Sequence, residues 1–197
     1  MPSFHIRALQ VTSLLVLLSL CLSACGSVTA SPARDPDAVA LAALSRQALK
    51  AASQVAPDPV LHQVDVVPPG ERAIFYYTDP AATFEISVDI PSPDAPSSQW
   101  HVSSTSLSKL VGIQAPALDM TALQVGAASV IVALTRTWSG CTPTSVTLYR
   151  NGDELEWTGF CRLPDGRLAS GTTNNRTREF QAGPEPLSFP PVTATPQ

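Results

Sequence analysis

Cysteine is the residue type in this 197-residue sequence with the clearest capacity for chemistry. Cys21 and Cys25 lie in an apolar N-terminal segment, whereas Cys141 and Cys161 lie 20 residues apart in the C-terminal half. Thiols can be covalently modified, oxidised to a disulfide or used as metal ligands. A metal site is disfavoured because no CxxC or HxxxH spacing supplies further ligands. Covalent modification and disulfide formation therefore remain.

Residues 1–24 have the pattern of a signal peptide. Arg7 precedes an uncharged apolar run of 12 residues, 11–22. This length suits the core of a signal peptide and falls short of the roughly 20 residues that span a bilayer. A membrane anchor and a buried core helix are the alternatives. We expect the segment to be removed during export.

The four residues Leu22-Ser23-Ala24-Cys25 resemble the lipobox of bacterial lipoproteins, in which Leu and two small residues precede an invariant Cys. The resemblance implies that Cys25 becomes the first residue. It would carry thioether-linked diacylglycerol and, commonly, an amide-linked acyl chain such as palmitate. An ordinary cut after Ala24 fits less well, because bulky Leu22 would lie three residues before the bond. A cut after Ala30 is a further alternative.

The same resemblance implies a location and a class of partner. Lipidated Cys25 would anchor an exported chain to the outer face of a bacterial membrane, either the cell membrane or an outer membrane. Small polar residues in 25–35 predict a flexible tether. The remaining 173 residues carry 11 basic and 16 acidic side chains without a basic cluster, which argues against nucleic acid. We expect the membrane and an envelope protein as partners, and no motif indicates a cofactor.

Loss of Cys21 and lipidation of Cys25 would leave Cys141 and Cys161 as the remaining thiols. Two thiols in an exported chain favour one disulfide, with a reduced buried pair as the alternative. We therefore predict a structural disulfide between these two residues.

The segment between the two thiols predicts a β-hairpin. An Asn-Gly pair at 151–152, flanked by alternating runs, is a strong signal for a two-residue turn. That turn places Cys161 opposite Thr142, one residue from Cys141. Because Pro143 should end regular pairing there, either the entering loop or a bulge would supply the one-residue shift, and the disulfide would clamp the open end of the hairpin.

The chain changes between helical and strand periodicity twice. One helix is expected over 36–55, with Asp35 as its cap and Asp37 near the positive end of its dipole. A second helix is expected over 120–138, capped by Asp119. The strand candidates, in which apolar side chains tend to alternate, are 61–67, 73–77, 83–90, 99–105, 144–150, 154–160 and 167–173.

This order predicts an α+β fold over 36–180. Two similar helix-plus-antiparallel-strand units, 36–112 and 117–180, would share or pair a sheet, followed by a Pro-rich tail over 181–197. In outline, the order resembles tandem PepSY-like and β-lactamase-inhibitor-like envelope domains. No residue motif carries that resemblance, so it implies no functional residue.

Candidate catalytic residues are few. Ser106 and Lys109 match the S-x-x-K pattern of penicillin-binding enzymes, but the S-D-N and K-T-G elements are missing. His62 and His101 lie in separate strand candidates on faces expected to be polar, and no third ligand or nucleophile accompanies them. The N-glycosylation sequon at 175–177 should have no meaning in a bacterial lipoprotein.

Aromatic residues suggest a binding face. Three consecutive rings at 75–77 occupy both faces of one strand, so a ring outside the main core would mark such a face, and Phe75 and Tyr77 are the candidates. Cover of this strand on both sides, by a helix and the C-terminal tail, is the alternative. We therefore expect a non-catalytic binding or interaction module at the cell envelope. An inhibitor or regulator of an envelope hydrolase, which the outline resemblance implies, and a small envelope enzyme are the alternatives.

Overall fold

The computed structural model describes residues 33–68, 72–79, 81, 83–107 and 116–187. The chain divides into two compact units, Met1–Ala33 and Arg34–Gln197, and the second contains the helices and strands below. The predicted signal peptide, Cys25 and Lys109 lie outside the described residues.

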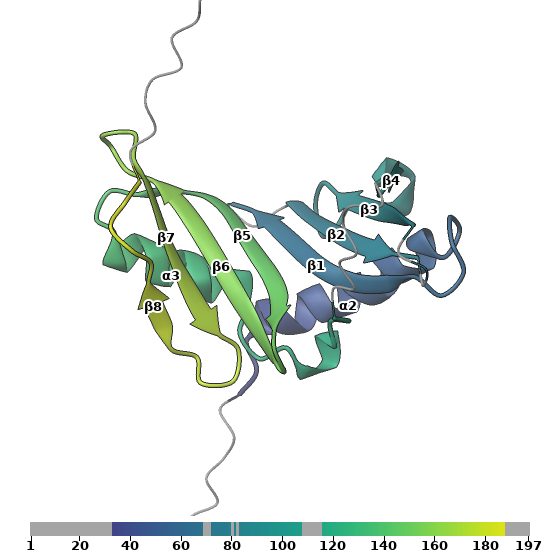
Figure 1. The fold of residues 1–197 in the computed structure, drawn as a ribbon, viewed down its shortest axis with the longest axis horizontal. Coiled ribbons are helices and arrows are strands. Elements are labelled where there is room, and N and C mark those ends of the chain that lie inside the picture. Colours follow the sequence, from purple (N-terminus) through teal and green to yellow (C-terminus); the bar gives the residue numbers. More distant parts are fainter. Residues whose placement is uncertain (1–32, 69–71, 80, 82, 108–115, 188–197) are drawn as a thin grey trace, which may run out of the picture. The chain divides into compact units, whose positions relative to one another are not determined.

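The second unit is built on one antiparallel sheet, with strand order β4-β3-β2-β1-β5-β6-β7-β8 (Figure 1). Two α-helices accompany it among the described residues, α2 (Pro36–Ala52) and α3 (Ala127–Thr137), so the fold is an α+β arrangement in which sheet predominates. Neither is long and apolar enough to cross a membrane. The strands are β1 (Val60–Val67), β2 (Arg72–Thr78), β3 (Phe84–Ile90), β4 (His101–Ser106), β5 (Thr142–Asn151), β6 (Glu154–Arg162), β7 (Leu168–Asn174) and β8 (Phe180–Ala182).

In each half of the sheet, the order of the strands along the chain runs from the centre of the sheet to its edge. β1 and β5 pair antiparallel at the centre. Strands β1 to β4 then run to one edge, and β5 to β8 run to the other. One helix precedes each run of four strands. Both helices lie behind the sheet in Figure 1.

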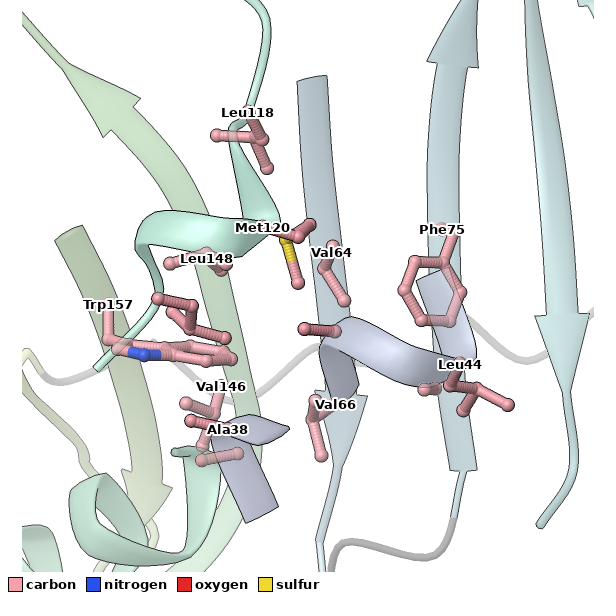
Figure 2. Close-up of a cluster of buried hydrophobic side chains, with 14 of the residues drawn as sticks. Ala38, Leu44, Val64, Val66, Phe75, Leu118, Met120, Val146, Leu148 and Trp157 are labelled. Atoms are coloured by element: carbon pink, nitrogen blue, oxygen red, sulfur yellow. The ribbon is translucent and has the colours of Figure 1, made fainter. Parts of the chain in front are cut away.

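The core lies between the sheet and the two helices. Small residues of α2, with Leu44, face the sheet, and the register aligns the apolar residues of the central strands on that side (Figure 2). This close packing of α2 depends on alanine at Ala38, Ala42, Ala48 and Ala52, all of which are buried. The largest fully buried side chains on the strands are Trp157, Tyr77, Phe75, Ile86, Ile90, Leu148, Val64, Val88 and Val146.

Phe75 and Tyr77 do not form an exposed binding face. Both are buried in the core, at 0% and 1% exposure, and the hydroxyl of Tyr77 donates a hydrogen bond to the carbonyl of Ser45 in α2. Phe75 pairs with Val88 across β2 and β3, and paired residues of neighbouring strands point to the same side. Because Val88 points into the core, Phe75 points into the core as well. The prediction that Phe75 and Tyr77 mark a binding surface is therefore wrong.

The second helix begins later than the sequence pattern indicates. The side chain of Asp119 accepts a hydrogen bond from the backbone N–H of Thr121, but this caps only a short 3-10 turn, Met120–Ala122. The chain is extended at Leu123, and α3 starts at Ala127. The apolar spacing continues through this break, which is why periodicity alone predicts one long helix.

The β5–β6 hairpin turns one residue later than predicted. Asn151 pairs with Glu154, so Gly152 and Asp153 form the turn, and Gly152 adopts a φ of +60° that favours glycine. Leu148 consequently faces Trp157. A register shift of two residues leaves every side chain on its original face, so the alternating pattern did not distinguish the two pairings.

Cys141 and Cys161 are joined in a disulfide, with their Cα atoms 5.6 Å apart. The ladder between β5 and β6 is irregular between Pro143 and Ser145, where a bulge is expected. Cys161 pairs with Pro143, so Cys141 is its diagonal neighbour. The bond closes the open end of the hairpin.

The folded domain extends past both predicted limits, 36 and 180. Arg34 donates from Nη2 to the carbonyl of Met120 at 2.7 Å, so the last residues of the predicted tether are held to the domain. At the other end, Leu187 forms an antiparallel bridge with Leu168, so the first residues of the predicted tail continue the sheet.

Reduction of the disulfide should destabilise the domain measurably. The chain-entropy model gives about 3 kcal/mol for a loop of the 20-residue separation found here. We expect the double variant Cys141→Ala, Cys161→Ala to lose about that much free energy of unfolding in urea titrations. Addition of a reductant should destabilise the wild-type protein and leave the double variant unchanged. Equal stability of the two proteins without reductant would contradict the assignment.

Candidate binding pocket

The sequence candidates for catalysis are not brought together. His62 is in β1 and His101 is in β4, with two strands between them. His62 Nε2 lies 3.2 Å from an oxygen of Glu85. Burial lowers the pKa of His62, and the charge and hydrogen bonding of Glu85 oppose this. Within the described part of the chain, no three His, Cys, Asp or Glu side chains are grouped so that they could hold a metal ion.

The face of the sheet away from the helices carries polar side chains that bond to one another. Arg72 forms a two-point ion pair with Asp89, at 2.6 and 2.9 Å. The hydroxyls of Ser87 and Ser103 lie 2.7 Å apart. Tyr76 lies on this face, and burial together with neighbouring acidic groups raises its pKa to about 12. Tyr76, rather than Phe75 or Tyr77, is therefore the ring of this strand outside the core.

Two aspartates at the start of α2 bind the N-terminus of α3. Asp35 Oδ2 accepts from the Gly126 N–H at 3.0 Å and from the Ser129 hydroxyl at 2.7 Å. Asp37 accepts from the Ala128 N–H at 2.8 Å. The Asp35 side chain makes no capping bond to its own helix. The sequence predicted that the Asp35 carboxylate would cap α2. In the structure this carboxylate binds the N-terminus of α3 instead.

The extended segment before α3 is held by one side chain from within β6 and one from the residue after β7. Asn175 accepts from the N–H groups of Gln124 and Val125 and donates to the carbonyl of Ala122. Trp157 Nε1 donates to the carbonyl of Val125 at 2.9 Å. Asn175 is buried, and both the oxygen and the nitrogen of its side-chain amide form hydrogen bonds. The asparagine of the sequon at 175–177 therefore has a structural role.

A partly open hollow of about 180 Å³ lies beside this helix N-terminus. Three remote parts of the chain build it: the residue before α2, the first turns of α3 with the segment before it, and the β7–β8 hairpin. The lining residues are Asp35, Val125, Ser129, Ala133, Thr173, Arg178 and Phe180.

The charged groups of the pocket are paired. Arg178 Nη1 lies 3.3 Å from Asp35 Oδ1, and both side chains are less than one third exposed. Burial alone would raise the pKa of Asp35, but hydrogen bonds from Ser129 and Gly126 and the charge of Arg178 outweigh it, so its pKa lies below the usual value. The carboxylate is therefore ionised at neutral pH, and the pair has no net charge.

Two further features of the pocket cost folding free energy. The hydroxyl of Thr173 is buried and has no hydrogen-bond partner in the structure. Arg178 has a φ of +62°, in the left-handed region that non-glycine residues rarely adopt. Strained backbone positions cluster at functional sites, and a buried hydroxyl without a partner requires an explanation.

Sequence reasoning identified only Asp35 among the pocket residues, and only as a helix cap. Its contacts reach across 91 residues to Gly126 and across 143 residues to Arg178. Local spacing contains no signal for contacts over such separations.

Comparisons with known proteins leave the family open. No protein-family model matches this sequence, and no curated protein matches it. Among solved structures, a candidate lipoprotein from Clostridium difficile 630 aligns with a TM-score of 0.49 and 10% sequence identity, covering 71% of this chain and 92% of that one. No residue role is transferred from that protein.

Replacement of Asp35 tests the contact that builds the pocket. We expect Asp35→Asn to lower the free energy of unfolding by about 1–2 kcal/mol at pH 7, because the helix N-terminus loses its charged partner. Since the folded pKa is depressed, the wild-type advantage should be complete above the unfolded pKa and disappear as the pH falls through the folded one.

The control is Asp94→Asn in the exposed loop before β4, which should change stability by less than about 0.5 kcal/mol. Urea titrations of the three proteins at pH 7 and pH 3 provide the measurement. An Asp35→Asn deficit that is as large at pH 3 as at pH 7 would contradict an ionic contribution.

Proposed function

We propose that this chain is a bacterial lipoprotein that holds a non-catalytic binding domain at the outer face of an envelope membrane. The observation that carries the proposal is the motif Leu22-Ser23-Ala24-Cys25 directly after an apolar run of 12 residues. Each buried methylene contributes about 0.8 kcal/mol, so two or three acyl chains on Cys25 would anchor the domain durably.

The disulfide supports export. Disulfides persist in oxidising compartments and are rare in the reducing cytosol. The bond between Cys141 and Cys161 uses both cysteines of the folded domain. This agrees with a domain that lies outside the cytoplasmic membrane, and leaves Cys25 as the thiol for lipid attachment once the signal peptide is removed.

The pocket beside α3 supports a binding role. It combines an ion pair, hydroxyl groups and apolar walls in a hollow that opens to the surface. Convergent polar groups in a concave apolar site are typical of ligand binding. An envelope enzyme would require a nucleophile with an activating base. The described pocket residues supply hydroxyls and a paired carboxylate instead.

We further propose that the domain consists of two similar units. Each would comprise one helix followed by four strands, and the units would join through β1 and β5. Antiparallel pairing of the first strand of each unit supports this, because a two-fold axis normal to the sheet produces the same relation. The outline resemblance to PepSY-like and β-lactamase-inhibitor-like domains stays a prediction.

The lipid anchor is tested by replacing Cys25 with Ser. We expect the variant to leave the membrane fraction or to retain its signal peptide, because the acceptor thiol is gone. Intact-mass analysis should show the mass of the acyl groups on the wild-type protein and none on the variant.

The matched control is Cys21→Ser, four residues earlier in the same apolar segment. It should leave mass and fractionation unchanged, since Cys21 would be discarded with the signal peptide. Membrane attachment and mass that do not differ between Cys25→Ser and wild type would rule out the lipoprotein assignment.

A further inference from the structure

We propose that the hollow at the N-terminus of α3 binds a small uncharged molecule that carries an amide or hydroxyl group on a short apolar body. The inference rests on the proposed binding role and names the site and the ligand class. It draws on an unpartnered hydroxyl, a neutralised ion pair and a constrained apolar wall.

Thr173 supplies the hydrogen-bonding group. Its side chain lines the hollow, the residue is only 4% exposed, and its hydroxyl has no partner. A buried hydroxyl without a partner costs folding free energy, and a valine of nearly the same shape would avoid that cost. A bound molecule that forms a hydrogen bond with Thr173 would explain why this position keeps a hydroxyl group.

The ion pair selects against charged ligands. Asp35 and Arg178 face the hollow 3.3 Å apart, so their charges cancel. Asp35 is also committed to Gly126 and Ser129 at the helix N-terminus. Because the pair has no net charge, a charged ligand would gain no net ionic attraction there to offset the hydration it loses on entry. A neutral polar group loses much less hydration.

The walls limit the size of the ligand. Val125, Ala133 and Phe180 contribute apolar surface. The Phe180 ring lies over Gly171, where an added Cβ would come within 2.2 Å of the ring, so this wall needs glycine on β7. A volume of about 180 Å³ is smaller than the roughly 300–1,000 Å³ of sites for drug-sized molecules. The site therefore suits a molecule the size of an amino-acid side chain.

The backbone of Arg178 supports a ligand clamp at the same place. Its φ of +62° is strained for a side chain of this kind. Arg178 lies in the turn between β7 and β8, where its N–H donates to the carbonyl of Asn174, and its guanidinium lies 3.3 Å from Asp35 in the lining of the hollow. Strain of this kind is retained where the surrounding structure holds a functional group in place.

Three probes that share an isopropyl body and have similar size test the ligand class: isobutyramide, isobutyrate and isobutylammonium. Each is titrated into the isotopically labelled full chain, as isolated from the producing cells, and followed by amide chemical shifts at pH 7. We expect saturable shifts with isobutyramide, centred on the amides of Val125, Ser129 and Thr173. The two charged probes should bind at least ten-fold more weakly. No saturable shift with isobutyramide, or equal binding of a charged probe, would overturn the proposal.

Substitutions at Thr173 test the role of its hydroxyl. Thr173→Val should weaken isobutyramide binding at least ten-fold, yet unfold at the same or a higher urea concentration than wild type, because it removes an unpartnered polar group. Thr173→Ser keeps the hydroxyl and should retain binding. The control Thr172→Val lies on the same strand with its side chain on the opposite face, and should bind as wild type does.

Undiminished binding by Thr173→Val, or loss of binding in Thr173→Ser, would overturn the assignment of Thr173. These measurements do not depend on membrane attachment, so failure of the lipid anchor and failure of the binding site give different results. Saturable binding by a protein that proves not to be lipidated would support the binding site and contradict only the proposed lipid anchor.

Discussion

The carboxylate of Asp35 at the N-terminus of α3 is the contact on which the arrangement of this domain depends. A helix N-terminus has unsatisfied N–H groups and a partial positive charge, and both favour a carboxylate. Asp35 accepts from Gly126 and Ser129 and also pairs with Arg178 from the β7–β8 hairpin. One side chain thus joins the start of α2, the start of α3 and the far edge of the sheet.

The same contact gives the pocket its chemistry. Because Asp35 is shared between the helix and Arg178, the hollow presents polar groups without a net charge, and the unpartnered hydroxyl of Thr173 lies beside apolar walls. A lipid on Cys25 would supply location, whereas this pocket would supply recognition. Both parts of the proposed function therefore rest on physical features that lie far apart in the chain.

Sequence reasoning predicted the classes of element better than their limits or partners. Seven strand candidates fall on strands β1 to β7, and the disulfide pair and the bulge near Pro143 are present. The predicted start of α3 was wrong, because the preceding segment is held extended: Asn175 accepts from the Gln124 N–H, and Trp157 donates to the Val125 carbonyl. The prediction that Phe75 and Tyr77 face outward was also wrong, because the register with β3 turns their side chains toward the core.

The sequence by itself determined what depends on short spacing: the signal-peptide pattern before Cys25, the alternation of the strands and the presence of two thiols in the folded domain. Only the tertiary structure decided which helix Asp35 caps, where the hairpin turns and which residues line the pocket. The physical reason is that a carboxylate can satisfy any N-terminus within reach. The helix that comes within reach is set by packing across 91 residues rather than by neighbouring sequence.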